Sequence, residues 1–174
     1  MTNPIDPELR AFARAAKILV PPKLWALKLH HKLALKACGK PTDGLTFDEV
    51  QIDRTGGDGQ IRAVIYKDKT ASKDDGPLPV MLYLHGGGYA IGLPEQAGDN
   101  IKRWINKRGA IFVVPQYRRS LQAPYPAAID DCYDTLLWVQ NNIESLGGDI
   151  HNIGVMGHSA GGGLTAALSL RNRD

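Results

Sequence analysis

The stretch Asn152-Ile153-Gly154-Val155-Met156-Gly157-His158-Ser159-Ala160-Gly161-Gly162-Gly163-Leu164 joins a short apolar segment to a run of glycines. We expect it to form a strand, a very sharp turn and then a helix. Within it, Gly157-x-Ser159-x-Gly161 has the spacing of a nucleophile elbow, whose serine stands at the tip of a strained turn. A Cβ at either glycine is expected to collide with the neighbouring strand or helix. The pattern predicts that the Ser159 hydroxyl stands above the carboxyl end of a sheet, near the positive end of a helix.

The segments before this stretch alternate between apolar runs and helical patterns. Buried strands are predicted at 80–84 and 110–114, and helices at 95–108 and 126–146. In the first of these helices we expect Trp104 to face the sheet together with Ile101 and Ile105. Strands that alternate with helices predict an α/β fold with a mostly parallel sheet.

The N-terminal part has a different organisation. Residues 45–52 and 60–66 alternate apolar and polar side chains on either side of a turn rich in Gly and Asp, which predicts an antiparallel hairpin at one sheet edge. Two amphipathic helices are expected before it, at 7–19 and 23–38. We therefore divide the chain into an N-terminal helical segment, residues 1–40, and a main domain, residues 45–174. The lysines of the second helix form either a solvated face or the face of a membrane-surface or lid helix.

Composition limits the classes of function. The 174 residues suit one domain, and a net charge of +3 without a Lys/Arg cluster argues against a nucleic-acid partner. No stretch is long enough for stable membrane insertion. Cys38 and Cys132 lie outside metal-ligand spacing, so no metal is expected, and free thiols in a reducing compartment are favoured over a disulfide. Charged residues precede any long apolar run, which argues against an ordinary signal peptide and makes a cytoplasmic location the expectation.

A second glycine-rich motif, His85-Gly86-Gly87-Gly88-Tyr89, directly follows the first buried strand. Glycines at the carboxyl end of a central strand expose backbone N–H groups to the crevice where ligands bind in such sheets. Two of these donors, with the N–H of Ala160, would be able to hold the oxygen of a tetrahedral intermediate. A plain glycine turn and a phosphate cradle are the alternatives, although no Gly-Lys-Ser/Thr follows to complete a nucleotide P-loop.

Together, the HGGG at 85–88 and the GHSAGG at 157–162 resemble the motifs of the hormone-sensitive-lipase-like branch of the α/β-hydrolases. Tyr117-Arg118 is similar to that family's YR motif, and Pro-Tyr-Pro-Ala-Ala-Ile-Asp-Asp at 124–131 is similar to its P-x-P-A-A-x-x-D segment. The resemblance runs from about residue 46 to residue 171. His158 stands where the family usually has Asp, and residues 119–123 replace its usual L-A-P-E.

This resemblance implies an α/β-hydrolase fold and hydrolysis of carboxylic esters, as in an esterase or lipase, through an acyl-serine intermediate. The substrate would be a small acyl ester, and no cofactor is implied. Ser159 would be the nucleophile of an elbow formed with Gly157, His158 and Gly161. The oxyanion hole would comprise Gly86, which shapes the loop, and the donors Gly87, Gly88 and Ala160. The two N-terminal helices look like part of the family's cap, which covers the acyl pocket.

A serine at its ordinary pKa needs a base, and in this fold an Asp or Glu and then a His follow the serine along the chain. After Ser159 there is no histidine, and the one acid is Asp174. Among the earlier histidines, His158 should project away from Oγ, the glycine loop should hold His85, and His151 should lie at the opposite end of the sheet. His30 and His31 would lie in the cap, so no histidine is well placed to act as the base.

We therefore expect an incomplete chain, with the fold truncated after the nucleophile helix and without the triad Asp and His. Two alternatives stay open. The chain is a non-catalytic module that binds a small ligand on the same fold, or a second chain completes the site. In the expected arrangement the elbow strand, residues 153–156, has no partner on one side, and this exposed sheet edge makes self-association possible.

Overall fold

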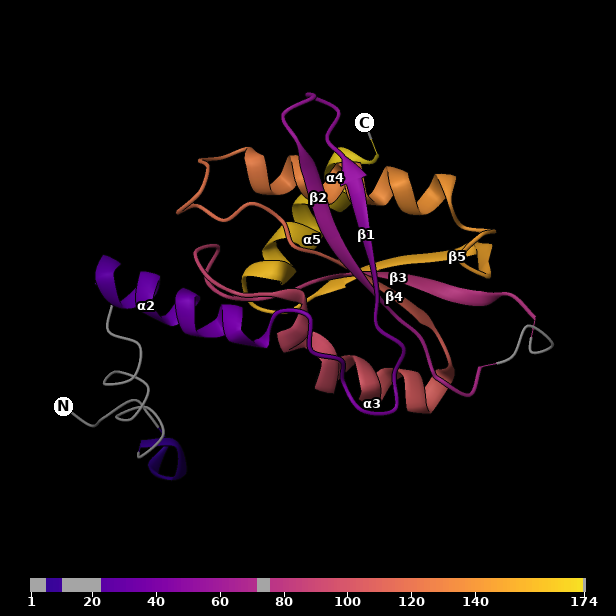
Figure 1. Cartoon of the computed structure of the whole chain (residues 1–174), viewed down its shortest axis with the longest axis horizontal. Coiled ribbons are helices and arrows are strands. Elements are labelled where there is room, and N and C mark those ends of the chain that lie inside the picture. The colour runs from indigo at the N-terminus through magenta and orange to yellow at the C-terminus, as the bar shows by residue number, and fades with distance from the viewer. Residues whose placement is uncertain (1–5, 11–22, 72–75, 174) are drawn as a thin grey trace.

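The computed structural model describes residues 6–10, 23–71 and 76–173, and in these residues it has a five-stranded sheet (Figure 1). The strands are β1 Asp48–Asp53, β2 Gln60–Tyr66, β3 Leu78–Leu84, β4 Ile111–Pro115 and β5 Gly148–Gly157. The helices are α2 Leu24–Ala34, α3 Gly98–Arg108, α4 Ala127–Asn141 and α5 Ala160–Arg171. Short 3-10 turns span Pro7–Leu9, Leu35–Ala37 and Pro94–Ala97.

The strand order is β1-β2-β4-β3-β5. β1 and β2 form the antiparallel hairpin that the sequence predicts, and β2 also pairs antiparallel with β4. The other two pairs are parallel: Leu82 of β3 lies opposite Val113 of β4 on one side and Val155 of β5 on the other. The predicted α/β fold, with its N-terminal hairpin at one edge of the sheet, is confirmed.

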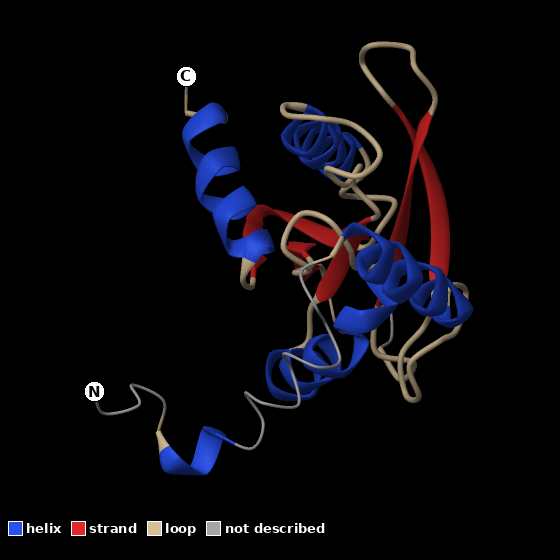
Figure 2. Ribbon diagram, turned by 90° about the vertical axis from the view of Figure 1, so that its left-hand side faces the viewer, coloured by secondary structure: helices blue, strands red, loops and turns tan. Residues whose placement is uncertain are grey.

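Helices cover both faces of the sheet, α3 on one side and α4 and α5 on the other (Figures 1 and 2). Successive side chains of β3 point to opposite faces, so Leu82 packs with α4 and α5, whereas Tyr83 packs on the α3 side. In β4, Val113 and Phe112 divide between the two faces in the same way. The continuous apolar runs of these strands are therefore explained by burial on both faces.

Two expectations about the helices are wrong. α4 ends at Asn141 and does not continue to residue 146. At this end the side-chain amide of Asn142 donates to the carbonyl of Trp138 at 2.8 Å. Turns then lead on to Gly147, which has φ +77°. Trp104 does not face the core and is 50% exposed, while Ile101 is buried. Trp104 lines an open surface cavity beside Met156 of β5, so it lies where the sheet ends rather than beneath it.

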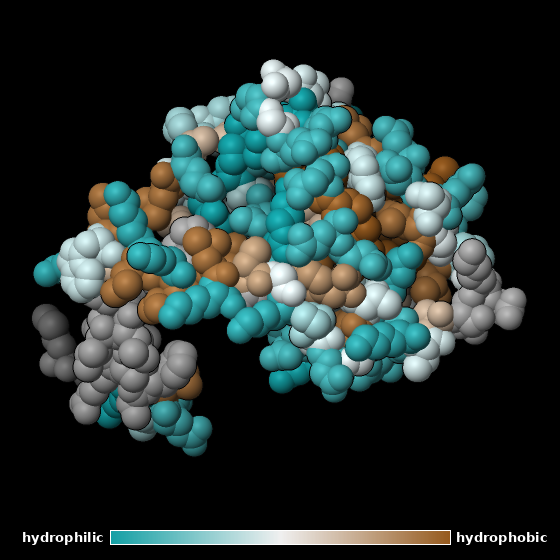
Figure 3. Space-filling view, viewed as in Figure 1, coloured by the Kyte–Doolittle hydropathy of each residue, from teal (hydrophilic) through white to brown (hydrophobic). Residues whose placement is uncertain are grey.

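The N-terminal segment is described only in part. Of the helix predicted over 7–19, residues 11–22 lie outside the described residues. The second predicted helix is present as α2, which extends away from the sheet (Figures 1 and 2). Four of its large apolar side chains are 49% to 62% exposed, and these are Leu24, Trp25, Leu29 and Leu33. Figure 3 shows apolar and hydrophilic residues interleaved over this helix. The division into a helical segment and a main domain stays a prediction.

β5 is an edge strand in the described part of the chain, because it pairs with β3 alone. From Asp149 to Gly157 none of its residues is fully buried. This confirms the expected exposed edge, which is longer than predicted because the strand begins at Gly148. The two cysteines are free thiols, as expected, with Cys38 exposed and Cys132 buried. No helix among the described residues has the length and apolar character needed to cross a membrane.

Candidate active site

The turn between β5 and α5 has the geometry of an elbow. Ser159 stands between the last residue of β5 and the first residue of α5, with φ +53° and ψ −124°. A Cβ built on Gly157 would lie 2.5 Å from the carbonyl oxygen of Gly161, and one built on Gly161 would lie 1.9 Å from that of Leu84. The structure confirms the steric reason for both glycines. It also confirms a backbone conformation at Ser159 that non-glycine residues rarely adopt.

The glycine loop begins beside this elbow. The parallel register pairs Leu84 at the end of β3 with Gly157 at the end of β5. The glycine loop and the elbow therefore both begin at the carboxyl ends of these neighbouring strands. Gly87 has φ +127°, and its carbonyl accepts from the N–H groups of Ala90 at 3.1 Å and Ile91 at 3.0 Å. A Cβ on Gly87 would lie 2.0 Å from the carbonyl oxygen of Ile91. The loop therefore closes tightly on itself at this glycine.

Three backbone N–H groups in the glycine loop and at the elbow are available as donors. Among the described residues, neither Gly87 nor Gly88 donates its N–H to a backbone carbonyl. Ala160 is the first residue of α5, where an N–H group has no carbonyl of its own helix to bond. Donors with these properties are the components of an oxyanion hole.

Tyr89 is a feature that the sequence analysis missed. In the described part of the chain it is, with Ser159, one of two non-glycine residues with positive φ, at +58°. Its phenol lies over the start of α5, because a Cβ on Gly163 would be 2.3 Å from the Tyr89 hydroxyl oxygen. A tyrosine after three glycines gives no signal of this conformation or of the contact with a helix far along the chain.

A cavity of about 330 Å³ lies between the first turn of α5, the first turn of α4 and the loop before α4. It lies in the size range of sites for small ligands. Its walls are mainly apolar and comprise Tyr89, Ser120, Ala123, Pro124, Tyr125, Ala128, Ile129, Gly163, Leu164 and Ala167. Since Tyr89 and Gly163 come from the two motifs of the site, the cavity adjoins both the glycine loop and the helix that follows Ser159.

The histidines contact other groups. His85 is buried and stacks on Tyr117 at 4.2 Å between ring centroids, and its Nδ1 lies 2.8 Å from the Gly86 carbonyl oxygen. Burial lowers the pKa of His85 from 6.5 to about 4, so the ring is neutral at pH 7. His158 lies with Nδ1 2.9 Å from the Tyr83 hydroxyl, and a Cβ on Gly86 would be 2.9 Å from its Nε2.

The remaining histidines are no closer to a catalytic arrangement. His151 is exposed in the first half of β5. The side chains of His30 and His31 lie outside the described part of the structure. In the part that the structure describes, no hydrogen bond joins the Ser159 hydroxyl to a histidine, and no group of His, Cys, Asp or Glu is arranged to hold a metal ion. The turn at Ser159 thus lies against the glycine loop, but among the described residues no histidine is hydrogen-bonded to the serine.

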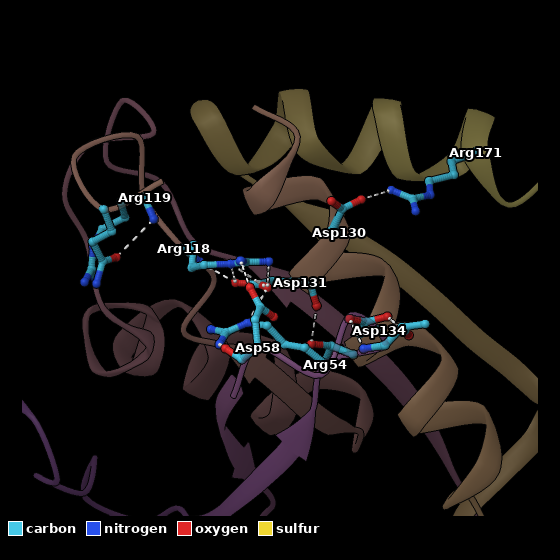
Figure 4. A network of polar contacts seen from close by, with 11 residues as sticks. Arg54, Asp58, Arg118, Arg119, Asp130, Asp131, Asp134 and Arg171 are labelled. Atoms are coloured by element: carbon cyan, nitrogen blue, oxygen red, sulfur yellow. Dashed lines mark hydrogen bonds and ion pairs between the residues drawn. The ribbon is translucent and has the colours of Figure 1, made fainter. Parts of the chain in front are cut away.

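A network of charged side chains supports the loops around the site (Figure 4). Asp131 on α4 is fully buried and accepts from Nε of Arg54 at 2.9 Å, from the backbone N–H of Arg118 at 2.7 Å and from Nε of Arg118 at 3.0 Å. Arg118 also reaches Asp58 in the hairpin turn, at 2.7 Å. Asp131 therefore joins the hairpin, the loop after β4 and α4.

The sequence predicted two members of this network without predicting that they meet. Arg118 and Asp131 both belong to motifs on which the family resemblance rests, and the structure pairs them. Arg54 was missed, since an arginine in a turn rich in Gly and Asp has the pattern of an ordinary solvated residue. Arg54, Asp58 and Arg118 line a surface cavity that does not include Ser159. We therefore assign the network to the support of the site rather than to its chemistry.

Comparison with known proteins agrees with this geometry. A family model described as the alpha/beta hydrolase fold matches residues 81–174, just over half of the chain. The matched residues include both the glycine loop and the elbow. The chain belongs to the alpha/beta hydrolase fold family, in the hormone-sensitive-lipase-like group that its motifs indicate.

Several of the proteins it resembles are named esterases. The carboxylesterase NlhH of Mycobacterium tuberculosis is 40% identical over 97 residues, which are 56% of this chain and 30% of that protein. An arylesterase of Saccharolobus solfataricus is 30% identical over 98% of this chain and 56% of its own length. The solved structure of a bacterial heroin esterase superimposes with a TM-score of 0.79 and 30% identity, over 98% of this chain and 53% of that one. The chain spans about half of the length of these last two relatives.

Proposed function

We propose that this chain carries the nucleophile and the oxyanion hole of a carboxylic ester hydrolase. Ser159 attacks the ester carbonyl and forms the acyl-serine intermediate. Gly87, Gly88 and Ala160 donate their N–H groups to the oxyanion, and Gly86 shapes the loop. The substrate is a small acyl ester, and no cofactor takes part. A cytoplasmic location also stays a prediction.

The observation that carries this proposal is the conformation of Ser159. A non-glycine residue at φ +53°, held by two glycines that tolerate no Cβ, is costly to maintain and is typical of functional sites. The turn stands beside a loop with N–H groups that no backbone carbonyl of the described residues accepts. The relatives that are named carboxylesterase, arylesterase and heroin esterase support ester hydrolysis as the reaction class.

The chain by itself is expected to turn over esters weakly. No histidine follows Ser159, and the described histidines bond to Gly86 and Tyr83 or lie on the surface. In serine hydrolases, loss of the base lowers kcat on the order of a million-fold, and the remaining acceleration comes from the oxyanion hole and from binding. A second segment or chain that supplies an Asp and a His would restore the full rate.

A non-catalytic role in binding a small ligand is the second candidate. It is favoured by the apolar cavity of about 330 Å³ beside the site, together with the lack of a hydrogen bond from Ser159 to any described histidine. In that case the glycine loop would donate hydrogen bonds to a carbonyl or carboxylate group of the ligand rather than to a transition state.

Hydrolysis of a short p-nitrophenyl ester by the chain and by Ser159→Ala tests the proposal. We expect slow release of p-nitrophenol by the unsubstituted chain and a lower rate in the variant. Rates that are equal in the two proteins would contradict the assignment of Ser159 as the nucleophile. Fast turnover that Ser159→Ala abolishes would instead show that a base is present in the chain, against our expectation.

A further inference from the structure

The segment 117–120 follows β4 and runs along the glycine loop, residues 85–92. It bonds to the loop at the beginning, the middle and the end. The Tyr117 hydroxyl donates to the carbonyl of His85 at 2.7 Å, the Ser120 N–H donates to that of Tyr89 at 2.8 Å, and Nη1 of Arg119 donates to that of Gly92 at 2.8 Å. The loop is therefore held by a neighbouring segment as well as by its own turns.

Arg119 is an unusual residue to find in this place. Its side chain is 2% exposed, yet among the residues that the structure describes it forms no ion pair with a carboxylate, and its Nε has no hydrogen-bond partner. Burial lowers the pKa of Arg119, but an arginine keeps its charge at neutral pH. A buried, unpaired cation is costly in free energy, and the hydrogen bond to the carbonyl of Gly92 offsets part of this cost.

Gly92 is well placed to control the loop. It has φ +112°, and a Cβ built on it would lie 2.4 Å from the carbonyl oxygen of Gly86 and 2.6 Å from Nδ1 of His85. The end of the loop is thus packed against its beginning. Gly87 lies between them and touches the carbonyl of Ile91, the residue before Gly92. A shift of Gly92 would therefore move the backbone at Gly87 and Gly88.

We propose that Arg119 is a positioning residue, which holds the glycine loop in the shape that directs the N–H groups of Gly87 and Gly88 at the oxyanion. This inference rests on the proposed function. Arg119 contacts the carbonyl of Gly92 and not the reacting atoms, so it acts through the loop.

Hydrogen exchange of the loop tests the contact without requiring turnover. Arg119→Met keeps the length of the side chain without a donor, and Arg119→Lys keeps a donating cation. Arg103→Met, at an exposed arginine of α3, is the control. We expect Arg119→Met to speed the exchange of amides in 85–92 about ten-fold, including the amides of Ala90 and Ile91. Arg119→Lys should restore most of the protection. Arg103→Met should leave the exchange rates unchanged. Unchanged exchange in Arg119→Met would overturn the proposal.

The chemical consequence is measured with a fluorophosphonate, whose phosphorus atom is attacked by Oγ of Ser159. The P–F bond breaks, fluoride leaves, the hydroxyl proton passes to solvent, and intact mass reports the adduct. Removing an oxyanion donor outright costs on the order of a hundred-fold in rate. Because Arg119→Met displaces donors without removing them, we expect labelling about ten-fold slower, with partial rescue in Arg119→Lys.

The two measurements separate the possible failures. If Arg119→Met loosens the loop but labels at the unchanged rate, Arg119 is a structural residue only and the positioning role is overturned. If Arg119→Met does not fold, the labelling rate of Arg119→Lys decides. The proposal expects a rate between that of the unsubstituted chain and that of Ser159→Ala. A rate equal to either of these two would count against it. No labelling of the unsubstituted chain would contradict the proposed function instead, and the exchange result then decides on the contact with Gly92.

Discussion

Individual backbone conformations determine whether the glycine loop can form. Gly87 and Gly88 are neighbours in this loop and both have positive φ, yet their surroundings differ. A Cβ on Gly87 would lie 2.0 Å from a backbone oxygen, whereas a Cβ on Gly88 would meet nothing within 4 Å. Substitutions at these two glycines therefore separate the effect of a close backbone contact, present only at Gly87, from the cost of positive φ, which both share.

Gly87→Ala is expected to lower the free energy of unfolding by about 3 kcal/mol or more, because backbone must move to admit the methyl group. Gly88→Ala should cost about 1 kcal/mol, the penalty of a left-handed conformation for an L-residue. Urea unfolding followed by circular dichroism measures both. Equal losses in the two variants would show that the close contact at Gly87 does not determine the shape of the loop.

His85 should make the stability of the molecule depend on pH. Its pKa is about 4 in the folded chain and about 6.5 when exposed, so the unfolded state binds more protons between these values. The free energy of unfolding therefore falls as pH decreases from about 6.5 toward 4, with a contribution on the order of 3 kcal/mol. His85→Gln should remove this part of the slope.

The measurement is urea unfolding at several pH values between 4.5 and 7 for the unsubstituted chain and two variants. His151→Gln serves as the control, since His151 is exposed in β5. It should keep the slope of the unsubstituted chain. A slope that His85→Gln leaves unaltered would mean that the buried imidazole is not the source of the pH dependence.

Elements far apart in the chain are joined by Asp131. It links α4 to the hairpin turn through Arg54 and to the loop after β4 through Arg118. The next residue, Asp130, pairs with Arg171 of α5 at the surface, at 2.5 Å. The two aspartates thus occupy the same turn of one helix but very different environments (Figure 4).

Asp131→Ala should lower the free energy of unfolding by about 3–5 kcal/mol, since it leaves Arg54 and Arg118 without their shared carboxylate in a partly buried place. Asp130→Ala should cost less than about 1 kcal/mol, because exposed pairs contribute little. Chemical denaturation of both variants under one set of conditions is the measurement. A small loss for Asp131→Ala would show that water replaces the buried carboxylate and that the network does not hold the elements together.

β5 is one of the two edge strands of the described sheet, and after a register shift before Ile153 it pairs regularly with β3 from Ile153 to Gly157. β5 presents its unpaired backbone on one side, Ile150 is 60% exposed, and Ile153 and Val155 are only partly buried. Strands of this kind pair with other chains unless charge, proline or a bulge prevents it. We therefore expect the 174-residue chain to self-associate in solution.

Size-exclusion chromatography with light scattering tests this at several concentrations. Ile150→Lys, which places a charge on the edge, should shift the chain toward monomer. Leu24→Lys makes the same change at a residue of α2 that is 56% exposed and should leave association unaltered. A monomer at all concentrations in the unsubstituted chain would contradict the expectation, and a response to Leu24→Lys alone would assign association to α2.

The sequence by itself determined the type and order of the elements and the glycines of the two turns. Those features depend on local patterns: apolar periodicity separates strands from helices, and a Cβ is excluded wherever backbone approaches backbone. The ends of elements were less predictable, and α4 stops early at Asn142, which leaves the helical conformation with φ −115° and ψ 11°. Trp104 was misplaced because helical periodicity does not show where a sheet ends.

Only the tertiary structure decided how the polar side chains are used. Asp131 meets Arg54 from 77 positions earlier, and Arg119 reaches the carbonyl of Gly92 from 27 positions away. Tyr89 adopts its positive φ while its hydroxyl lies over α5. None of these contacts has a periodic signal, because a buried charge or a strained residue is stabilised by whichever partner the folded chain brings to it. The sharp turn at Ser159 could thus be predicted from neighbouring residues, whereas the support of the glycine loop depends on segments that meet only after folding.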